Sequence, residues 1–164
     1  MSTLLELAQG LQHSGFGTAL AESRYAFPLI EGTHLIGLSI SVGLIFLIDL
    51  RLVGLFLRQV PAHTLLRSLL PIVLWGFALI FITGVLLFIS EADTIIVSPA
   101  FPVKLVLLFL GGLNALYFEF KLSREPAFQS NTAAILPDKV RYSGFASLAL
   151  WTLVIIAGRM LAYL

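Results

Sequence analysis

The sequence has no cysteine among its 164 residues. This absence excludes disulfide bonds, thiolate metal sites, iron–sulfur ligation and a cysteine nucleophile. Charge is also scarce, because charged residues make up 12% of the chain and hydrophobic residues 59%. Soluble globular domains carry roughly 25% and 45–50% of these residues. Together with a mean hydropathy of +0.99, the composition predicts a protein that lies mostly in lipid.

The chain also lacks the common catalytic and nucleotide-binding motifs. It has no P-loop, no Gly-x-Gly-x-x-Gly after a strand, no Gly-x-Ser-x-Gly elbow and no His-Glu-x-x-His. A net charge of +1 without a basic face argues against nucleic acid as a partner. We therefore expect a protein without catalytic activity of its own, whose partners are the lipid bilayer and other membrane subunits or further copies of the chain.

Four apolar stretches account for most of the sequence. A hydrocarbon core of about 30 Å requires about 20 helical residues per crossing. The stretches do not alternate apolar and polar residues, as the strands of a membrane barrel do. We predict an all-α fold, an integral membrane four-helix bundle that forms a single transmembrane domain over residues 1–164. The predicted spans cover about residues 27–57, 70–90, 101–120 and 142–163.

The positions of lysine and arginine predict the orientation of this bundle. If the first and third connections face the cytoplasm, that side holds most of the ten basic residues, in keeping with the positive-inside rule. The other side then holds Arg24, Lys104 and Arg159. This distribution predicts a multi-pass protein of the bacterial inner membrane with both termini in the periplasm.

The N-terminal segment has an amphipathic pattern. Leu4, Leu7, Ala8 and Leu11 recur at helical spacing, which predicts an interfacial helix over about residues 2–14 that lies flat on the outer surface of the membrane. One basic residue, Arg24, precedes the first span. We therefore expect no cleaved leader.

Small residues within the spans indicate where helices approach closely, because apolar burial does not select helix partners in lipid. We expect such contacts at Gly37, Ser41 and Gly43 of the first span, and at glycines of the second and third. Trp75 and Trp151 are expected to fill space inside the bundle.

Ionisable residues inside a span are costly and mark functional sites. Glu31 and His34 are three residues apart and share a helical face. His34, Gly37 and Ser41 share a face too, so that a flat slot lies below the histidine. The predicted topology places two cations at the same depth in the outer leaflet, Lys104 and Arg159.

Three interpretations of this cluster remain open. In the first it is structural, and Glu31 pairs with Lys104 or Arg159. In the second it holds a cofactor, haem b or a quinone, with His34 as the metal ligand where the cofactor is haem. Membrane b-type haems normally take two histidines, and the chain has three in all, His13, His34 and His63. In the third it is a pathway for protons, a metal or small anions.

A second polar set lies toward the predicted inner side. Asp49 and Arg51 close the first span, and Asn114 lies within the third. We expect Asp49 to pair with an arginine from the inner loops and to fix the helix register. Asn114 is expected to bond a neighbouring helix rather than a substrate. All three are interpreted as structural polar residues.

Several runs of the sequence resemble a known family. They are FPLIEGTHLIG at residues 27–37, DLRLVG at 49–54, PAFPVKL at 99–105 and GLNA at 112–115. The chain resembles a group of small, uncharacterised bacterial inner-membrane proteins of four helices, and this resemblance implies the fold and the location. More distantly, a histidine in an early span and a lysine opening a later one are similar to the copper-resistance D proteins and the cytochrome b561-like bundles. The additional intramembrane histidines of the latter are absent.

These observations lead to one functional hypothesis and two alternatives. The hypothesis is an accessory or anchor subunit of a membrane electron-transfer assembly, with a haem or quinone site in the outer leaflet around His34. The first alternative is a purely structural or assembly subunit of a membrane complex. The second is a component that passes small ions or a metal such as copper.

Overall fold

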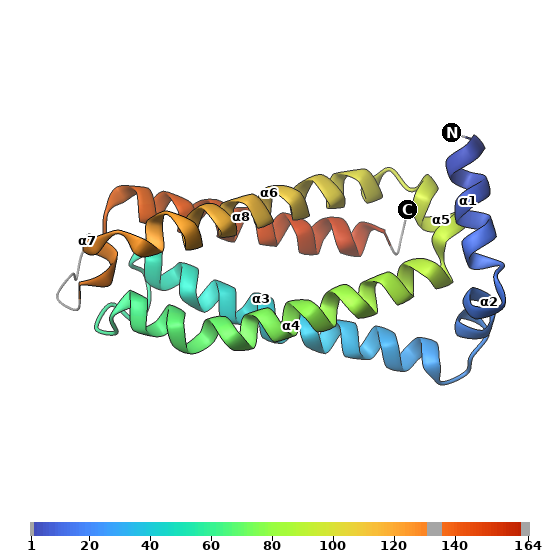
Figure 1. The fold of residues 1–164 in the computed structure, drawn as a ribbon, viewed down its shortest axis with the longest axis horizontal. Coiled ribbons are helices and arrows are strands. Elements are labelled where there is room, and N and C mark those ends of the chain that lie inside the picture. Colours follow the sequence, from blue (N-terminus) through green and yellow to red (C-terminus); the bar gives the residue numbers. More distant parts are fainter. Residues whose placement is uncertain (1, 131–135, 162–164) are drawn as a thin grey trace.

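Four long helices run side by side in the computed structural model, which describes residues 2–130 and 136–161 (Figure 1). Each is long and apolar enough to cross a membrane, and the described residues contain no strand. The predicted all-α membrane bundle is therefore confirmed. The long helices are α3 (Ala26–Val53), α4 (Ala62–Ser90), α6 (Ala100–Phe120) and α8 (Asp138–Met160). The short elements are α1 (Ser2–Gln12), α2 (Gly15–Ala21), α5 (Ala92–Val97), the 3-10 helix η1 (Leu122–Arg124) and α7 (Pro126–Gln129).

The ends of the helices are set by local backbone chemistry and differ from the ends of the apolar runs. α3 ends at Val53, earlier than predicted, because Gly54 adopts a left-handed conformation with φ 85° and stops the helix. α4 begins earlier than predicted, directly after Pro61, and its first two turns are too polar to be recognised as a span. The predicted end of the fourth span, at residue 163, lies outside the described residues.

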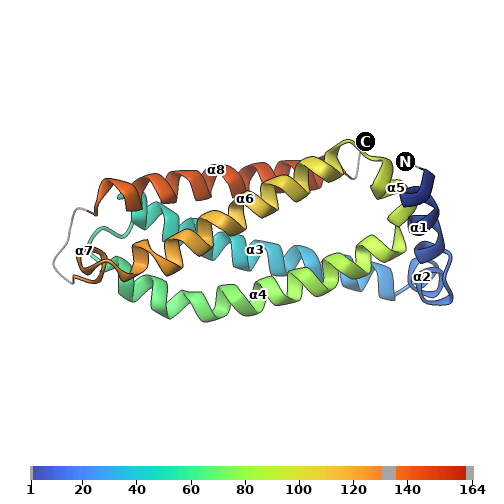
Figure 2. The ribbon, with the colours of Figure 1, turned by 45° about the horizontal axis from the view of Figure 1, so that its top comes forward.

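The bundle consists of two helix pairs, α3 with α4 and α6 with α8, which are joined through contacts between α3 and α8. We call the end that carries the α3–α4 connection, η1 and α7 the basic end. It bears Arg51, Arg58, Arg67, Lys121, Arg124, Lys139 and Arg141. Figures 1 and 2 show that the two pairs lie close together here and diverge toward the other end.

A compact apolar core holds the basic end together. Ile48 and Leu52 of α3 pack with Leu66 of α4 and with Phe118 of α6. Phe128 of α7 is 1% exposed and meets Phe118 edge to face, at a ring-centroid distance of 5.4 Å. Farther along the bundle, the buried Trp151 of α8 packs against Phe77 of α4. Trp75 does not fill space as predicted, because 79% of its surface is exposed on the outside of α4.

The opposite end is covered by α1, α2 and α5, and we call it the capped end. α1 lies across the ends of the long helices (Figure 1) and packs against α5. The side chain of Gln12 accepts a hydrogen bond from the Asp93 amide at 2.9 Å. Leu4 and Leu7 of the predicted apolar stripe are 61% and 67% exposed. These two leucines therefore remain available to a membrane surface, whereas Ala8 of the same stripe is buried.

The N-terminal segment forms two helices where one was predicted. α1 ends at Gln12, and the Ser14 side chain caps α2 by accepting a hydrogen bond from the amide of Gly17 at 3.1 Å. A serine in this role is a strong helix-start signal. The hydrophobic pattern alone did not reveal it, because the first apolar stripe continues almost to the cap.

Candidate functional site

The predicted site begins with a hydrogen bond between two helices at the capped end. Nδ1 of His34 on α3 lies 2.8 Å from Oγ1 of Thr83 on α4. Thr83 is 5% exposed and His34 is half-buried. The sequence analysis had singled out the histidine and not its threonine partner.

The second bond of Thr83 determines which nitrogen of His34 carries the proton. The Thr83 hydroxyl donates to the backbone carbonyl of Leu79 at 2.7 Å, and a carbonyl oxygen can only accept. Because a hydroxyl has one hydrogen, its oxygen is left to accept from His34, so Nδ1 carries the proton in a neutral ring. The other nitrogen, Nε2, is then an acceptor with a free lone pair. A neutral imidazole held in this way is suited to accept a hydrogen bond or to ligate a metal.

The face of α3 below His34 is closed by α4. A Cβ atom added to Gly84 would lie 3.2 Å from Cε1 of His34, and one added to Gly37 would lie 3.1 Å from Cγ1 of Ile80. Ser41 is fully buried against Gly76 of α4, where its hydroxyl has no hydrogen-bond partner in the described part of the chain. Gly37 and Ser41 therefore allow two helices to approach closely, and the predicted flat slot is filled by α4.

Lys104 is the second predicted site residue that approaches His34. It lies near the start of α6 and is half-buried, and a Cβ atom added to Gly158 of α8 would lie 3.5 Å from its Nζ. Its positive charge acts electrostatically on the His34 ring. Histidine, threonine and lysine thus come from three helices to one region of the capped end.

The two remaining members of the predicted cluster lie at its margin. Glu31 is exposed, and it forms no ion pair with Lys104 or Arg159 among the described residues. Arg159 directly follows Gly158 on α8 and is also exposed. The structure therefore gives no support to the predicted charge pair of Glu31.

An acidic group adjoins the site at the junction of α4 and α5. Burial raises the pKa of Glu91 above its ordinary value of 4.5, and repulsion from Glu31 and Asp93 raises it further. The capped end therefore combines three carboxylates on its rim with the Lys104 ammonium inside the bundle.

The polar residues at the basic end are arranged differently from the prediction. The carboxyl of Asp49 is hydrogen-bonded to the Ser147 side chain of α8 and forms no ion pair among the described residues. Arg51 is directed elsewhere, because its Nε donates to the backbone carbonyl of Val60 at 2.6 Å. The expected pairing of Asp49 with an arginine is therefore wrong, since the nearest arginine in sequence bonds the loop after α3.

Asn114 joins α6 to α8 through two reciprocal hydrogen bonds. Its Nδ2 donates to the Ser143 carbonyl at 3.1 Å, and the Ser143 hydroxyl donates to its Oδ1 at 3.0 Å. Ser143 and Ser147 are four residues apart and share a face of α8. That face supplies hydroxyls to both neighbouring helices, and the sequence analysis did not identify either serine.

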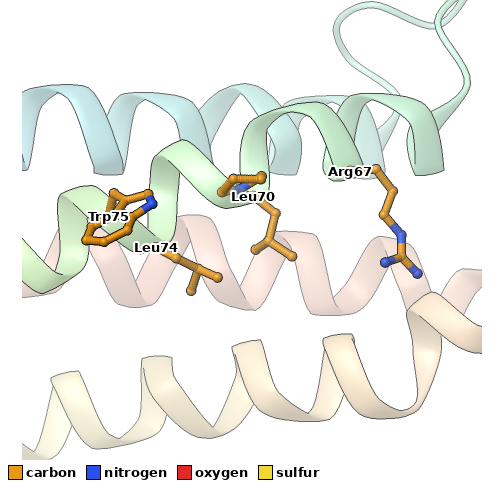
Figure 3. Close-up of a pocket in the computed structure, with 5 residues that line it drawn as sticks. Arg67, Leu70, Leu74 and Trp75 are labelled. Carbon is orange, nitrogen blue, oxygen red and sulfur yellow. The ribbon is translucent and has the colours of Figure 1, made fainter.

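A hollow of about 450 Å³ lies on α4, away from His34. Figure 3 shows the side chains of Arg67, Leu70 and Leu74, which point from α4 toward α6. Pro71 and Trp75 complete the lining. Apart from Arg67 at the basic end, these side chains are apolar, so the hollow offers little polar chemistry to a ligand.

Metal-ligating side chains do not gather in the part of the chain that the structure describes. No group of three or more histidine, aspartate or glutamate residues there could hold a metal ion. His63 lies in the first turn of α4 at the basic end, and His13 follows α1 as an exposed residue. Any metal on His34 would therefore need ligands from outside these residues.

Comparison with known proteins places the chain in a family without assigning an activity. No curated protein and no solved structure matches the chain. The likeness to the copper-resistance D and cytochrome b561 bundles thus stays a prediction. One family model matches residues 19–164, which includes all four long helices. The chain belongs to the family of unknown function DUF6644.

Proposed function

We propose that this protein is an accessory or anchor subunit of a membrane electron-transfer assembly, and that His34 and Lys104 hold the head group of a quinone at its capped end. The observation that carries the proposal is the bond from His34 to Thr83, which leaves Nε2 as a free acceptor. A quinol hydroxyl needs such an acceptor, and a quinone carbonyl needs a donor such as the Lys104 ammonium.

The position of these side chains also favours a lipid-soluble ligand. Both are half-buried at the end where the helix pairs diverge (Figure 2). A quinone carries electrons and protons through the bilayer and can approach the site sideways from the hydrocarbon. Polar residues inside a membrane are retained for functions of this kind.

Haem fits these residues less well than a quinone does. The face of α3 below His34 is occupied by α4, with Ile80 against Gly37 and Gly76 against Ser41. His63 cannot supply the second histidine ligand, since it lies at the basic end. Haem ligation by His34 stays a prediction that would need a ligand from a partner subunit.

The test is to purify the protein in mild detergent from its native membrane and to measure extractable quinone per chain. Oxidised and dithionite-reduced absorption spectra of the same sample report haem. We expect bound quinone in the wild type and its loss in His34→Ala and Lys104→Gln. His63→Ala, at the other end of the bundle, is the matched control and should retain it.

Two results would overturn this proposal. A sample without quinone and with a featureless spectrum would favour the purely structural subunit, for which His34→Ala leaves the activity of the host complex intact. Quinone that is retained in both His34→Ala and Lys104→Gln would place the ligand elsewhere on the protein.

A further inference from the structure

The most isolated ionisable group of the bundle is Asp49, in the last turns of α3. Its surface is 4% exposed, and one of its oxygens, Oδ2, is buried without a hydrogen-bond partner among the described residues. In the same part of the chain, the side chain that bonds the carboxyl is Ser147 of α8, itself 8% exposed. One hydroxyl therefore has to satisfy a group that can accept about four hydrogen bonds when it is ionised.

No positive charge compensates this carboxyl among the described residues. Arg51 donates to the Val60 carbonyl, and Arg141 forms an ion pair with Asp138 at 3.6 Å. The residues of α8 seen in contact with this part of α3 are uncharged, namely Gly144 and Ser147. The other ionisable groups near this end are Arg58 in the α3–α4 connection, His63 and Arg67 on α4, Glu119 on α6, Lys121, Arg124 and Glu125 after α6, and Lys139 on α8. None of them forms an ion pair with Asp49 in the described chain.

An anion in this position would be costly. Burial of a charge without a partner costs several kcal/mol, and a group in such a place becomes neutral instead. A metal cation could neutralise it only with several oxygen ligands. The other polar side chains nearby are already hydrogen-bonded, because the Ser143 hydroxyl donates to the side-chain oxygen of Asn114.

We infer that Asp49 is a proton-binding site, in which the carboxyl is held as a neutral acid in the contact between α3 and α8. The proton exchanges with water at the basic end, because Asp49 is about one helical turn from the end of α3. This inference does not depend on the proposed quinone site, which lies at the other end of the bundle.

Loss of the proton should loosen the contact between the two helix pairs. The Asp49 carbonyl lies 3.3 Å from a Cβ atom added to Gly144, so α3 and α8 are in close contact at this point. A charged carboxylate here would require water or a cation, and either would have to enter beside this close contact. Binding and release of the proton at Asp49 should therefore tighten and loosen the α3–α8 contact.

Infrared spectroscopy of the full chain in lipid vesicles tests the inference. We expect a carboxylic acid C=O band at pH 7, where exposed carboxyls are ionised, and its gradual loss at higher pH. Asp49→Asn should lack the band, whereas Glu91→Gln, the matched control, should retain it. Ser147→Ala removes the only donor to the ionised form, so the loss of the band should move up by about one pH unit, a tenfold change in proton affinity.

Several outcomes would overturn the inference. One is the absence of the band from the wild type at pH 7, a result that needs no variant to fold. A band that persists in folded Asp49→Asn would assign the proton to another residue. Disappearance of the band when sodium ions are added at constant pH would show that the site binds a monovalent cation instead.

Discussion

At the basic end, Asn114 and Ser143 satisfy each other across two helices, whereas at the capped end His34 bonds Thr83 and keeps one ring nitrogen unused. The helix pairs are close together at the first end and diverge toward the second (Figures 1 and 2). Reciprocal bonds fix the packing of helices in lipid. At the more open capped end, the unused ring nitrogen of His34 is instead available to a ligand.

The strongest test of this difference is to disrupt the helix packing at the basic end. Gly144→Val places a side chain against α3, where an added Cβ atom lies 3.1 Å from Leu52 and 3.3 Å from the Asp49 carbonyl. Overpacking of this kind costs about 1–3 kcal/mol. We expect a corresponding loss in the free energy of unfolding, measured by detergent titration. Gly112→Val is the control, because nothing lies within 4 Å of an added Cβ atom there, and equal losses would contradict the packing.

At the capped end, Thr83→Val removes the hydroxyl and keeps the shape of the side chain. His34 then keeps the Ile80 carbonyl as its acceptor and loses the bond to the hydroxyl, which costs about 0.5–1.5 kcal/mol. The control is Thr152→Val, because that exposed hydroxyl bonds its own helix at the Leu148 carbonyl. A loss in the free energy of unfolding no larger than that of Thr152→Val would show that the His34–Thr83 bond is not a structural contact.

The strength of the reciprocal pair can be measured with a double-mutant cycle. Asn114→Ala and Ser143→Ala should show a coupling of about 0.6 kcal/mol, and at most about 1.7 kcal/mol, as for other hydrogen bonds between membrane helices. A parallel cycle of Asn114→Ala with Ser147→Ala should give a smaller coupling, because Ser147 bonds Asp49 instead. If both cycles give the same value, the serine face of α8 acts as a single network.

The smallest expected effect concerns the rim of the capped end. The pKa of Glu91 is raised in the folded protein, so the folded state holds this proton more tightly than the unfolded state does. Stability therefore falls as the pH rises from about 4.5 through the folded pKa, and the ionised carboxylate is unfavourable at pH 7. Glu91→Gln should raise the melting temperature at pH 7 by about 1 °C or less.

Thermal unfolding at two pH values checks the direction of this pH dependence. The gain of Glu91→Gln over the wild type should vanish below pH 4.5, where the glutamate is protonated in both states. Glu22→Gln, an exposed carboxyl on the same end, provides the comparison. A gain that is the same at both pH values would mean that the effect is not one of charge.

The sequence predicted the four spans because length and hydropathy are properties of each segment alone. Which faces of the helices meet depends on their rotation about their own axes, and lipid-facing and buried faces are equally apolar. For this reason Trp75 could not be distinguished from Trp151, although only Trp151 is buried. The pairing of Gly76 with Ser41 depends on the same rotation.

The same limit applies to the site. His34 and Asp49 were recognisable because charged and titratable residues are rare in a span. Their partners, Thr83 and Ser147, are common small residues of membrane helices and carry no signal of their own. Charge complementarity favoured an arginine for Asp49, but the loop after α3 provides Arg51 with a backbone carbonyl instead.

The unequal lengths of the helices have a consequence for the membrane around them. α3 has 28 residues and α4 has 29, against 21 in α6 and 23 in α8. At 1.5 Å per residue the first pair is roughly 42 Å long and the second roughly 32–35 Å. In the same bilayer the longer pair has to tilt more or to extend beyond the hydrocarbon core, and tilt agrees with the divergence of the pairs. A thinner bilayer would widen that angle, so the distance between His34 and Lys104 is coupled to membrane thickness.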